Sequence, residues 1–326
     1  MDILNNDFIT YDCIRTSVEI TPEEQVAFAV EKGDMLFQRS SETLEDVGRA
    51  NVYMDDRPAV FGGFVIRGKK KAEYNPMFFR YLLASPYARK KVIPMGAGAQ
   101  HFNIGQDGLS KVKLHFPILQ EQQKIADLLR LINERISTQN KIIEKLESLI
   151  KGIAHLVAGM GKPNIRIAEC LECTSSTLQE SEVSDLGTYP VYGANGIVGY
   201  LDSYNTSDEA IYIVKDGSGV GSVIYVKGRC SATGTLNILT AKQDYSLQFL
   251  YYLLRVFNYD PYKTGMAIPH IYFKDYGKAK IFCPPYAGQL RYAQMLDAID
   301  TKLLTEQKFL ISLNCQKQYL LRQMFI

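Results

Sequence analysis

Six cysteines are the side chains of this sequence that could bind a metal or carry redox chemistry: Cys13, Cys170, Cys173, Cys230, Cys283 and Cys315. Only Cys170 and Cys173 form a CxxC pair, and no second CxxC or CxxH completes a zinc ligand set. The pair could be a structural or redox site, but reduced and mostly buried thiols are the simpler interpretation. We therefore expect no metal site and no cofactor.

Two other motifs resemble catalytic ones only in part. Residues 283–286 read CPPY, similar to the Asn/Asp-Pro-Pro-aromatic motif of amino-methyltransferases, in which the first side chain accepts a hydrogen bond from the target amine. A thiol is a poor acceptor for that role. Residues 217–222 read GSGVGS, which is short of a dinucleotide fingerprint because it leads into the β-branched SVIYV and not into a helix. With no Lys-Ser/Thr phosphate loop either, the sequence predicts a chain that is not an enzyme.

The longest periodic stretch is residues 117–157, which has no internal proline and one glycine, Gly152, near its end. Its apolar residues recur at spacings of three and four, which predicts a helix with one apolar stripe. At a rise of about 1.5 Å per residue this helix is roughly 60 Å long. An apolar stripe of that length needs a partner.

The partner lies in the same chain, because residues 284–326 repeat the pattern. The segments that lead into the two stretches also match, KVKLHFP at 111–117 and KAKIFCP at 278–284, and Gln122 then aligns with Gln289. Further upstream, residues 73–85 match residues 244–256. The chain therefore contains an internal duplication, in which each copy is a globular module followed by a long helix.

Both modules are expected to be mixed α/β. In the first, we predict irregular β or loop over 8–30, strands within 33–41 and 51–71, a helix over 74–91, a glycine loop at 96–108 and a strand at 111–117. In the second, residues 210–240 predict short strands with glycine turns, 245–257 a helix and 265–277 a second glycine loop. The predicted fold is α+β, with two globular domains and two long helices in an internal repeat. The predicted boundaries are 1–116 and 161–283 for the domains, and 117–160 and 284–326 for the helices.

Composition adds weak constraints. The formal net charge of +2 means that any nucleic-acid binding must depend on local basic clusters. No run of eighteen apolar residues and no signal-peptide pattern occurs, so we expect a cytoplasmic protein without a membrane span.

Residues 116–136 (FPILQEQQKIADLLRLINERI), the weaker 284–303 and the terminal LLRQMF resemble the paired helical regions of type I restriction-modification specificity subunits. YPVYGANGIVGYLD at 189–202 and GDMLFQRSS at 33–41 resemble pieces of that family's target-recognition domains. The resemblance covers nearly the whole chain, and its most specific part is the start of the long helix.

The resemblance implies an architecture of two globular target-recognition domains separated by two long antiparallel helices and related by a pseudo-twofold axis. It also implies DNA sequence recognition without catalysis. Each domain would read one half of a bipartite, non-palindromic target on double-stranded DNA. Two modification subunits would methylate adenine, and restriction/translocase subunits would cleave. Since B-DNA rises about 3.4 Å per base pair, the helix length would set the gap between the half-sites. The first module lacks a counterpart of the GANG segment, so we expect it to be shortened at its N-terminus.

Candidate DNA-binding residues are the basic and amide or hydroxyl side chains near the predicted turns, because such groups contact phosphates and base edges. In the first module they are Gln38, Arg39, Ser40, Arg49, Arg67, Lys69, Lys70, Lys71, Gln100, His101 and Asn103. In the second they are Asn195, Lys215, Ser218, Arg229, Thr233, His270, Tyr272 and Lys274. For each single residue a solvated surface role is the alternative, and the two glycine loops are the stronger candidates as groups.

Some leucines and isoleucines widen the helical stripes beyond a two-helix seam. We predict that they dock the modification subunits: Leu129, Ile143, Ile150, Leu304 and Leu321. The alternative function is a helical-scaffold adaptor whose modules bind proteins. Steep salt dependence of binding would distinguish a DNA reader from such an adaptor.

Overall fold

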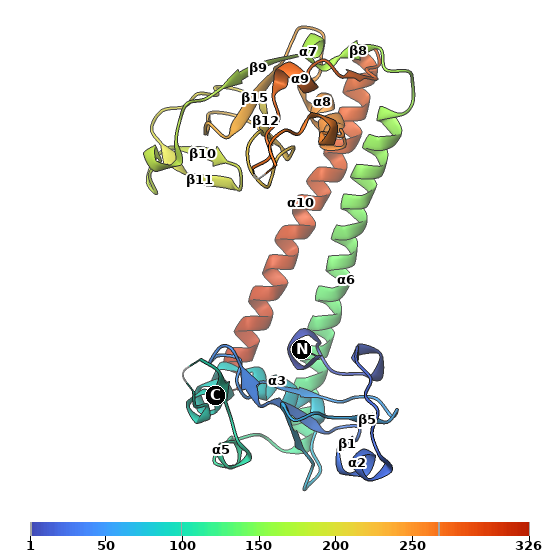
Figure 1. Ribbon diagram of the computed structural model, residues 1–326, viewed down its shortest axis with the longest axis vertical. Coiled ribbons are helices and arrows are strands. Elements are labelled where there is room, and N and C mark those ends of the chain that lie inside the picture. Colours follow the sequence, from blue (N-terminus) through green and yellow to red (C-terminus); the bar gives the residue numbers. More distant parts are fainter. Residues whose placement is uncertain (1, 99, 267, 326) are drawn as a thin grey trace. The chain divides into compact units, whose positions relative to one another are not determined.

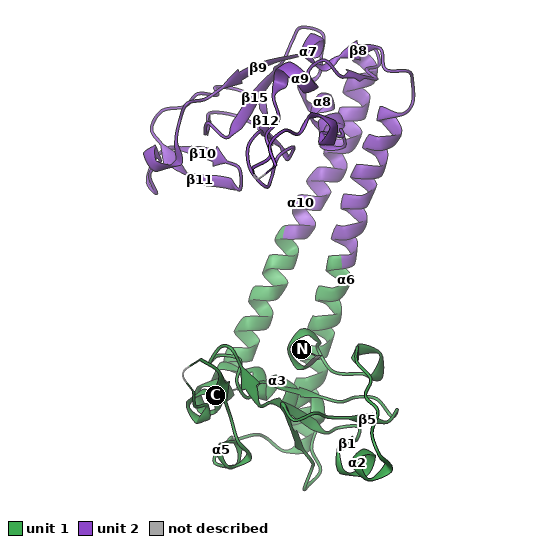
Figure 2. Ribbon diagram, viewed as in Figure 1, with its two compact units in different colours: residues 1–140, 308–326 green, residues 141–307 purple. Residues whose placement is uncertain are grey.

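The computed structural model describes residues 2–98, 100–266 and 268–325, and the chain forms two compact units (Figures 1 and 2). Unit 1 comprises residues 1–140 and 308–326, and unit 2 comprises residues 141–307. Each unit therefore holds one globular domain together with part of each long helix. Among the described residues, no helix is apolar over enough of its length to cross a membrane.

The core of unit 1 is a three-stranded antiparallel sheet in the order β4-β2-β6. The strands are β2 (Met35–Gln38), β4 (Ala50–Val52) and β6 (Val65–Gly68). Side chains alternate between the two faces of β2. Met35 and Leu36 accordingly belong to different clusters of buried residues.

Two helices follow the sheet of unit 1, α3 (Pro76–Ala84) and α4 (Pro86–Val92). The single helix predicted over 74–91 is interrupted because Ser85 caps α4 with Pro86 as its first residue. Asn75 caps α3 by accepting a hydrogen bond from the N–H of Phe78 at 2.8 Å. Both helix starts therefore follow a capping residue and a proline.

Shorter elements complete unit 1. They are α1 (Asp2–Asn5), η1 (Tyr11–Cys13), α2 (Pro22–Ala27), β1 (Ala29–Val30), β3 (Ser40–Ser41), β5 (Ala59–Val60), η2 (Ile93–Met95), β7 (Phe102–Asn103) and α5 (Gln106–Ser110). The prediction of irregular β or loop over 8–30 is wrong at α2, where Thr21 and Glu24 form a capping box. The strand predicted at 111–117 is also absent from the described structure of that segment.

Unit 2 has a four-stranded antiparallel sheet in the order β13-β12-β15-β9. The strands are β9 (Leu171–Ser175), β12 (Ala210–Val214), β13 (Val223–Val226) and β15 (Leu236–Ala241). A second sheet, β11-β10-β14, consists of β10 (Tyr189–Gly193), β11 (Gly196–Leu201) and β14 (Ser231–Ala232). The central strand β12 is buried along its whole length.

The helix that matches α3 is α8 (Leu247–Arg255), capped by Ser246. The remaining elements of unit 2 are β8 (Ile165–Arg166), α7 (Ile167–Cys170), η3 (Glu180–Glu182), η4 (Asp260–Tyr262), α9 (Phe273–Tyr276) and β16 (Lys280–Ile281). The predicted helix over 245–257 and the strands within 210–240 are confirmed.

Two long helices, α6 (Leu119–Ala158) and α10 (Tyr286–Gln323), link the units. α6 begins in unit 1 and ends in unit 2, whereas α10 begins in unit 2 and ends in unit 1, so they run in opposite directions (Figure 2). In unit 1, Leu129 of α6 packs with Leu321 of α10. In unit 2, Val157 of α6 lies in one core cluster with Ala293 of α10. The α+β fold with two long antiparallel helices is therefore as predicted.

A buried glutamine fixes the start of each long helix. In unit 1, Oε1 of Gln122 accepts a hydrogen bond from the N–H of Asn75 at 3.0 Å. In unit 2, Oε1 of Gln289 accepts one from the N–H of Ser246 at 2.9 Å. Each glutamine also donates to the carbonyl of the proline before its helix, Pro117 or Pro284. The sequence match between the two glutamines thus reflects one shared role.

Candidate nucleic-acid interface

The central strand of unit 1 ends beside the glycine loop. Just beyond β2, the N–H of Arg39 donates to the carbonyl of Phe64 at 2.8 Å, and the carbonyl of Arg39 accepts from the N–H of Ile104 at 2.9 Å. Arg39 itself is exposed. The backbone therefore holds a solvated cation between the neighbouring strand and the loop.

The same two backbone bonds occur at the end of β12 in unit 2. The N–H of Lys215 donates to the carbonyl of Thr235 at 3.0 Å, and its carbonyl accepts from the N–H of Ile271 at 2.9 Å. Lys215 is thus the structural equivalent of Arg39. Both were predicted as DNA-binding residues, and the structure places them at equivalent positions.

A polar pair lies beside each of these cations. In unit 1, Oγ of Ser40 donates to Oδ1 of Asn103 at 2.5 Å, and the two residues are paired through β3 and β7. In unit 2, Nδ1 of His270 lies 2.7 Å from Oδ1 of Asp216, and these residues form a β-bridge. The pairs correspond in both of their members. Ser40 and Asp216 directly follow the cation, and Asn103 and His270 occupy the same position of the two glycine loops.

Asp216 was not predicted as a site residue. It shares no side-chain chemistry with Ser40, and its segment reads as a plain glycine turn. Only the position directly after Lys215 could have identified it, once Lys215 and Arg39 were known to be equivalent.

Glycine is required at the turn that shapes each loop. Gly98 has φ +143°, and a Cβ there would lie 1.9 Å from the carbonyl oxygen of His101. Gly265 has φ +87°, and a Cβ there would lie 2.3 Å from the carbonyl oxygen of Ile268. Any side chain would push the loop open, so these glycines hold Asn103 and His270 in place.

Other predicted residues of the loops and turns are exposed. Gln100 and His101 lie in the loop of unit 1, and Asn195 and Ser218 lie in turns of unit 2. Gln38 is partly buried, and its Nε2 donates to the carbonyl of Ser40 at 3.0 Å. It supports the polar pair from within the chain.

Aromatic rings accompany two of the cations in unit 2. The guanidinium of Arg229 lies 5.1 Å from the ring centre of Tyr204, and its Nη1 donates to the hydroxyl of Tyr189 at 3.3 Å. That hydrogen bond raises the pKa of Arg229. Nζ of Lys274 lies 5.2 Å from the ring centre of Tyr272. Both side chains are exposed, as phosphate contact requires.

Of four further predicted DNA-binding residues, two are enclosed by the chain and two form ion pairs on its surface. Thr233 is only 1% exposed and its Oγ1 lies 2.8 Å from Oγ1 of Thr235, so its prediction is corrected: it has no surface to offer a ligand. Arg67 is largely buried, with Nε 3.7 Å from Asp34. Arg49 is paired with Asp46 at 2.6 Å, and Lys69 with Glu31 at 3.5 Å.

The predicted partner-docking residues also need a correction. Four of the five, Leu129, Ile143, Ile150 and Leu321, are buried within the chain. Only Leu304 is exposed, at 55%. Apolar residues in the middle of the stripe are buried within the chain, and the apolar residues next to them in sequence remain exposed. Buried side chains cannot dock a partner.

The cysteine pair behaves as protonated thiol. Burial raises the pKa of Cys173 to about 11, and a hydrogen bond with Cys283 raises that of Cys170. A thiolate is the form that binds metals. Within residues 2–98, 100–266 and 268–325, no cluster of three or more His, Cys, Asp or Glu side chains could hold a metal ion.

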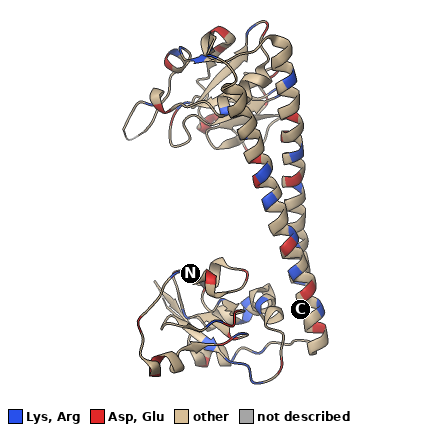
Figure 3. Cartoon of the chain, turned by 90° about the vertical axis from the view of Figure 1, so that its right-hand side faces the viewer, with Lys and Arg blue, Asp and Glu red and all other residues tan. Residues whose placement is uncertain are grey.

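Charges of both signs are spread over the chain. Basic and acidic positions alternate along the long helices in Figure 3, and ion pairs such as Arg130 with Glu134, at 2.6 Å, lie on their exposed faces. The local cations at the ends of β2 and β12 are therefore the better candidates for a phosphate contact than the helices.

The chain is similar to known proteins both in sequence and in structure. Two curated relatives are the type I restriction enzyme EcoprrI specificity subunit of Escherichia coli and a putative type I restriction enzyme specificity subunit of Haemophilus influenzae. They are 27% identical over 113 residues and 28% identical over 123 residues, which is 35% and 37% of this chain. The matched stretches span only 28% and 32% of the length of those relatives.

Two solved structures share the fold. An S subunit of a type I restriction-modification system from M. genitalium has a TM-score of 0.61 at 19% identity, over 92% of this chain and 84% of that one. A structure described as the basis of complex assembly and conformational transition of the type I R-M system has a TM-score of 0.58 at 16% identity, over 90% and 81%.

The family model of the type I restriction modification DNA specificity domain matches the chain twice, over residues 1–148 and 165–314. The two matches follow the internal duplication seen in the sequence and in the two units. The resemblance of the sequence to type I restriction-modification specificity subunits is therefore confirmed. The chain belongs to the type I restriction modification DNA specificity domain family.

Proposed function

We propose that this chain recognises DNA for a type I restriction-modification complex and carries out no chemistry itself. Each unit contacts one half of a bipartite, non-palindromic target, while separate subunits methylate or cleave. Family membership supports this function, and so do the equivalent polar sites of the two units.

The observation that carries the proposal is that the two units share the same backbone arrangement at this site but carry different side chains on it. Unit 1 presents Arg39, Ser40 and Asn103, and unit 2 presents Lys215 and the pair of Asp216 with His270. The guanidinium and the amide of unit 1 offer one set of hydrogen-bond donors and acceptors to base edges. The carboxylate and the imidazole of unit 2 offer a different set. Equivalent positions with different chemistry are what two unlike half-sites require.

Low net charge fits such a reader. At +2 the chain has little long-range attraction for DNA. Affinity would come from a few cations placed at the loops, and the rest from partner subunits. Double-stranded DNA, two modification subunits and restriction/translocase subunits are the proposed partners.

We further propose that the modification subunits dock on the exposed apolar side chains of the long helices. Exposed residues of this kind occur on the part of α6 in unit 1, such as Leu131, and on the part in unit 2, such as Leu149 and Leu156. On α10, Leu304 and Ile311 are exposed. These residues take the place of the buried ones first predicted.

The proposal is tested by co-expressing the chain with a type I modification subunit and sequencing the host methylome. A single split motif with adenine methylation is expected. Alanine at both Arg39 and Lys215 should reduce methylation of that motif. A chain that supports methylation without any sequence preference, or that binds its partners but never DNA, would instead be the helical-scaffold adaptor.

A further inference from the structure

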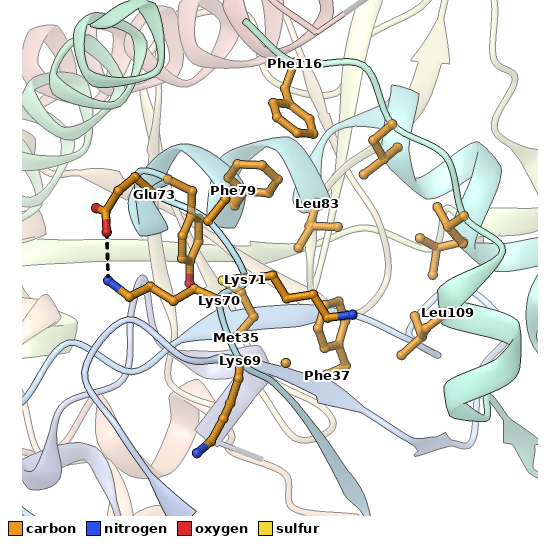
Figure 4. Close-up of a pocket in the computed structure, with 16 residues that line it drawn as sticks. Met35, Phe37, Lys69, Lys70, Lys71, Glu73, Phe79, Leu83, Leu109 and Phe116 are labelled. Carbon is orange, nitrogen blue, oxygen red and sulfur yellow. Dashed lines mark hydrogen bonds and ion pairs between the residues drawn. The ribbon is translucent and has the colours of Figure 1, made fainter. Parts of the chain in front are cut away.

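Unit 1 contains an open apolar pocket of about 380 Å³ beside its sheet (Figure 4). Met35 and Phe37 of β2 line one side, and Phe79, Leu83 and Leu109 line others. Figure 4 shows these side chains arranged around the space. An apolar pocket of this kind at the edge of a sheet suggests a site where another segment packs.

The equivalent space in unit 2 is filled. Counting from Arg39 and Lys215, Met35 and Phe37 correspond to Ile211 and Ile213. Those isoleucines form one core cluster with Ile167 and Leu171, which belong to α7 and β9. Residues 164–175 thus occupy in unit 2 the space that is open in unit 1.

The sheet edge differs in the same way. In unit 2, β9 pairs with β15, with Leu239 opposite Cys173 and Thr240 opposite Glu172. In unit 1 the equivalent strand is β6, and it is the last strand of its sheet among the described residues. The N–H of Val65 donates to the carbonyl of Gly62 at 3.0 Å, and beyond Val65 the outer backbone groups of β6 can pair with an added strand.

The segment before the long helix shows the third difference. In unit 2, the amide of Asn164 bonds both backbone groups of Cys283, at 2.8 and 2.9 Å, and β8 pairs with β16. The equivalent of Cys283 is Phe116, whose backbone bonds to no described residue and whose side chain is 55% exposed. The strand predicted at 111–117 is therefore missing because its partner strand is missing.

A lysine is placed to hold such a segment. Nζ of Lys242 donates at 2.9 Å to the carbonyl of Ala168, the second residue of the short helix α7. The aligned residue in unit 1 is Lys71, which lines the open pocket and is exposed. Unit 1 therefore keeps the lysine, although no described residue of unit 1 takes the place of Ala168, whose carbonyl accepts the bond in unit 2.

The first residues of the described chain do not fill the pocket. Ile3 and Ile9 are buried in a cluster with Leu36, which lies on the opposite face of β2 from Met35 and Phe37. Residues 3–9 are therefore not the occupant of the pocket.

We propose that unit 1 binds a polypeptide segment built like residues 164–175 of unit 2. The segment adds a strand to β6 by main-chain pairing and places apolar side chains, at the positions of Ile167 and Leu171, in the pocket. It carries acidic residues at its strand, because the register that sets Glu172 opposite Thr240 sets it opposite Lys69 in unit 1. This inference does not depend on DNA recognition.

The test uses the full chain and a synthetic peptide with the sequence of residues 162–177, labelled at its N-terminus. Fluorescence anisotropy should show saturable 1:1 binding. The chain variant Lys71→Glu should weaken it by about tenfold through like-charge repulsion and loss of the carbonyl contact. Lys90→Glu, an equal charge change at an exposed position that does not line the pocket, should leave it unchanged. The peptide with Leu171→Asp should not bind.

Hydrogen exchange locates the bound peptide. Protection is expected at residues 65–70 and 112–116 of the chain, in unit 1. Absence of saturable binding, binding that Lys71→Glu leaves intact, or protection confined to unit 2 would each overturn the proposal. Protection of 65–70 in the chain alone, appearing only as it dimerises, would also overturn it and assign the pocket to a second copy.

Discussion

Leu129 offers the sharpest test of how the long helices are used. Its side chain is 0% exposed and packs in one cluster with Phe78, Leu321 and Phe325. Truncating a buried leucine to alanine removes its contacts and leaves a cavity, which costs about 3 kcal/mol of unfolding free energy. For a domain of this size that lowers the midpoint of thermal unfolding by roughly 6–12 °C.

The matched control is Leu131→Ala, two residues along the same helix and 54% exposed. It should change the unfolding free energy by less than about 0.5 kcal/mol. Circular dichroism melts of the two variants and of the unaltered chain measure the difference. The result bears on assembly as well, because Leu131→Ala should weaken capture of a modification subunit more than Leu129→Ala does once both are folded.

Equal, small shifts for the two variants would refute the reasoning. They would mean that Leu129 is not enclosed by the chain, and that the stripe as first predicted is free to dock a partner. A large loss of stability for Leu131→Ala would refute it in the opposite sense, because an exposed side chain has little packing to lose.

Three further predictions follow from the duplicated frame. Arg39→Ala and Lys215→Ala should each lower the affinity of the assembled complex for DNA and reduce the slope of log K against log salt by about one, as measured by titration at several salt concentrations. Gly265→Ala should abolish recognition of one half-site while circular dichroism shows a folded chain, because the new Cβ would meet a carbonyl at 2.3 Å and displace only the loop. Gln289→Ala should lower the unfolding free energy by about 2 kcal/mol, as measured by thermal unfolding, because it leaves the buried N–H of Ser246 unpaired. Gln294→Ala, at an exposed position of α10, should be neutral.

The sequence predicted the features that depend on long patterns. The two long helices and the duplication follow from apolar spacing and from matches that extend over many residues, whereas the opposite directions of the helices were expected from the family resemblance. The alignment of Gln122 with Gln289 was visible in the sequence, and the structure explains it by one hydrogen-bonding role. Such features survive because many residues carry the same signal.

Features that depend on one residue's neighbours could not be predicted. Leu303 and Leu304 both fit the apolar stripe, yet only Leu303 is buried. Adjacent residues on a helix point about 100° apart, so one partner surface cannot cover both. The strand at 111–117 failed for a similar reason: its residues match 278–284, but a strand forms only where another strand pairs with it.

The equivalence of Ser40 with Asp216 shows how the frame and the chemistry are separated. The positions of both residues are fixed by backbone hydrogen bonds of Arg39 and Lys215, which any non-proline residue could make. The side chains contribute no packing that the sheet needs, because both cations and both polar pairs lie at the sheet's end and not in its core. Substitution at these positions therefore changes what each unit presents at its surface without a large cost in stability. Recognition can diverge between the two units while the fold of each stays the same, and this is why the site was harder to find from the sequence than the helices.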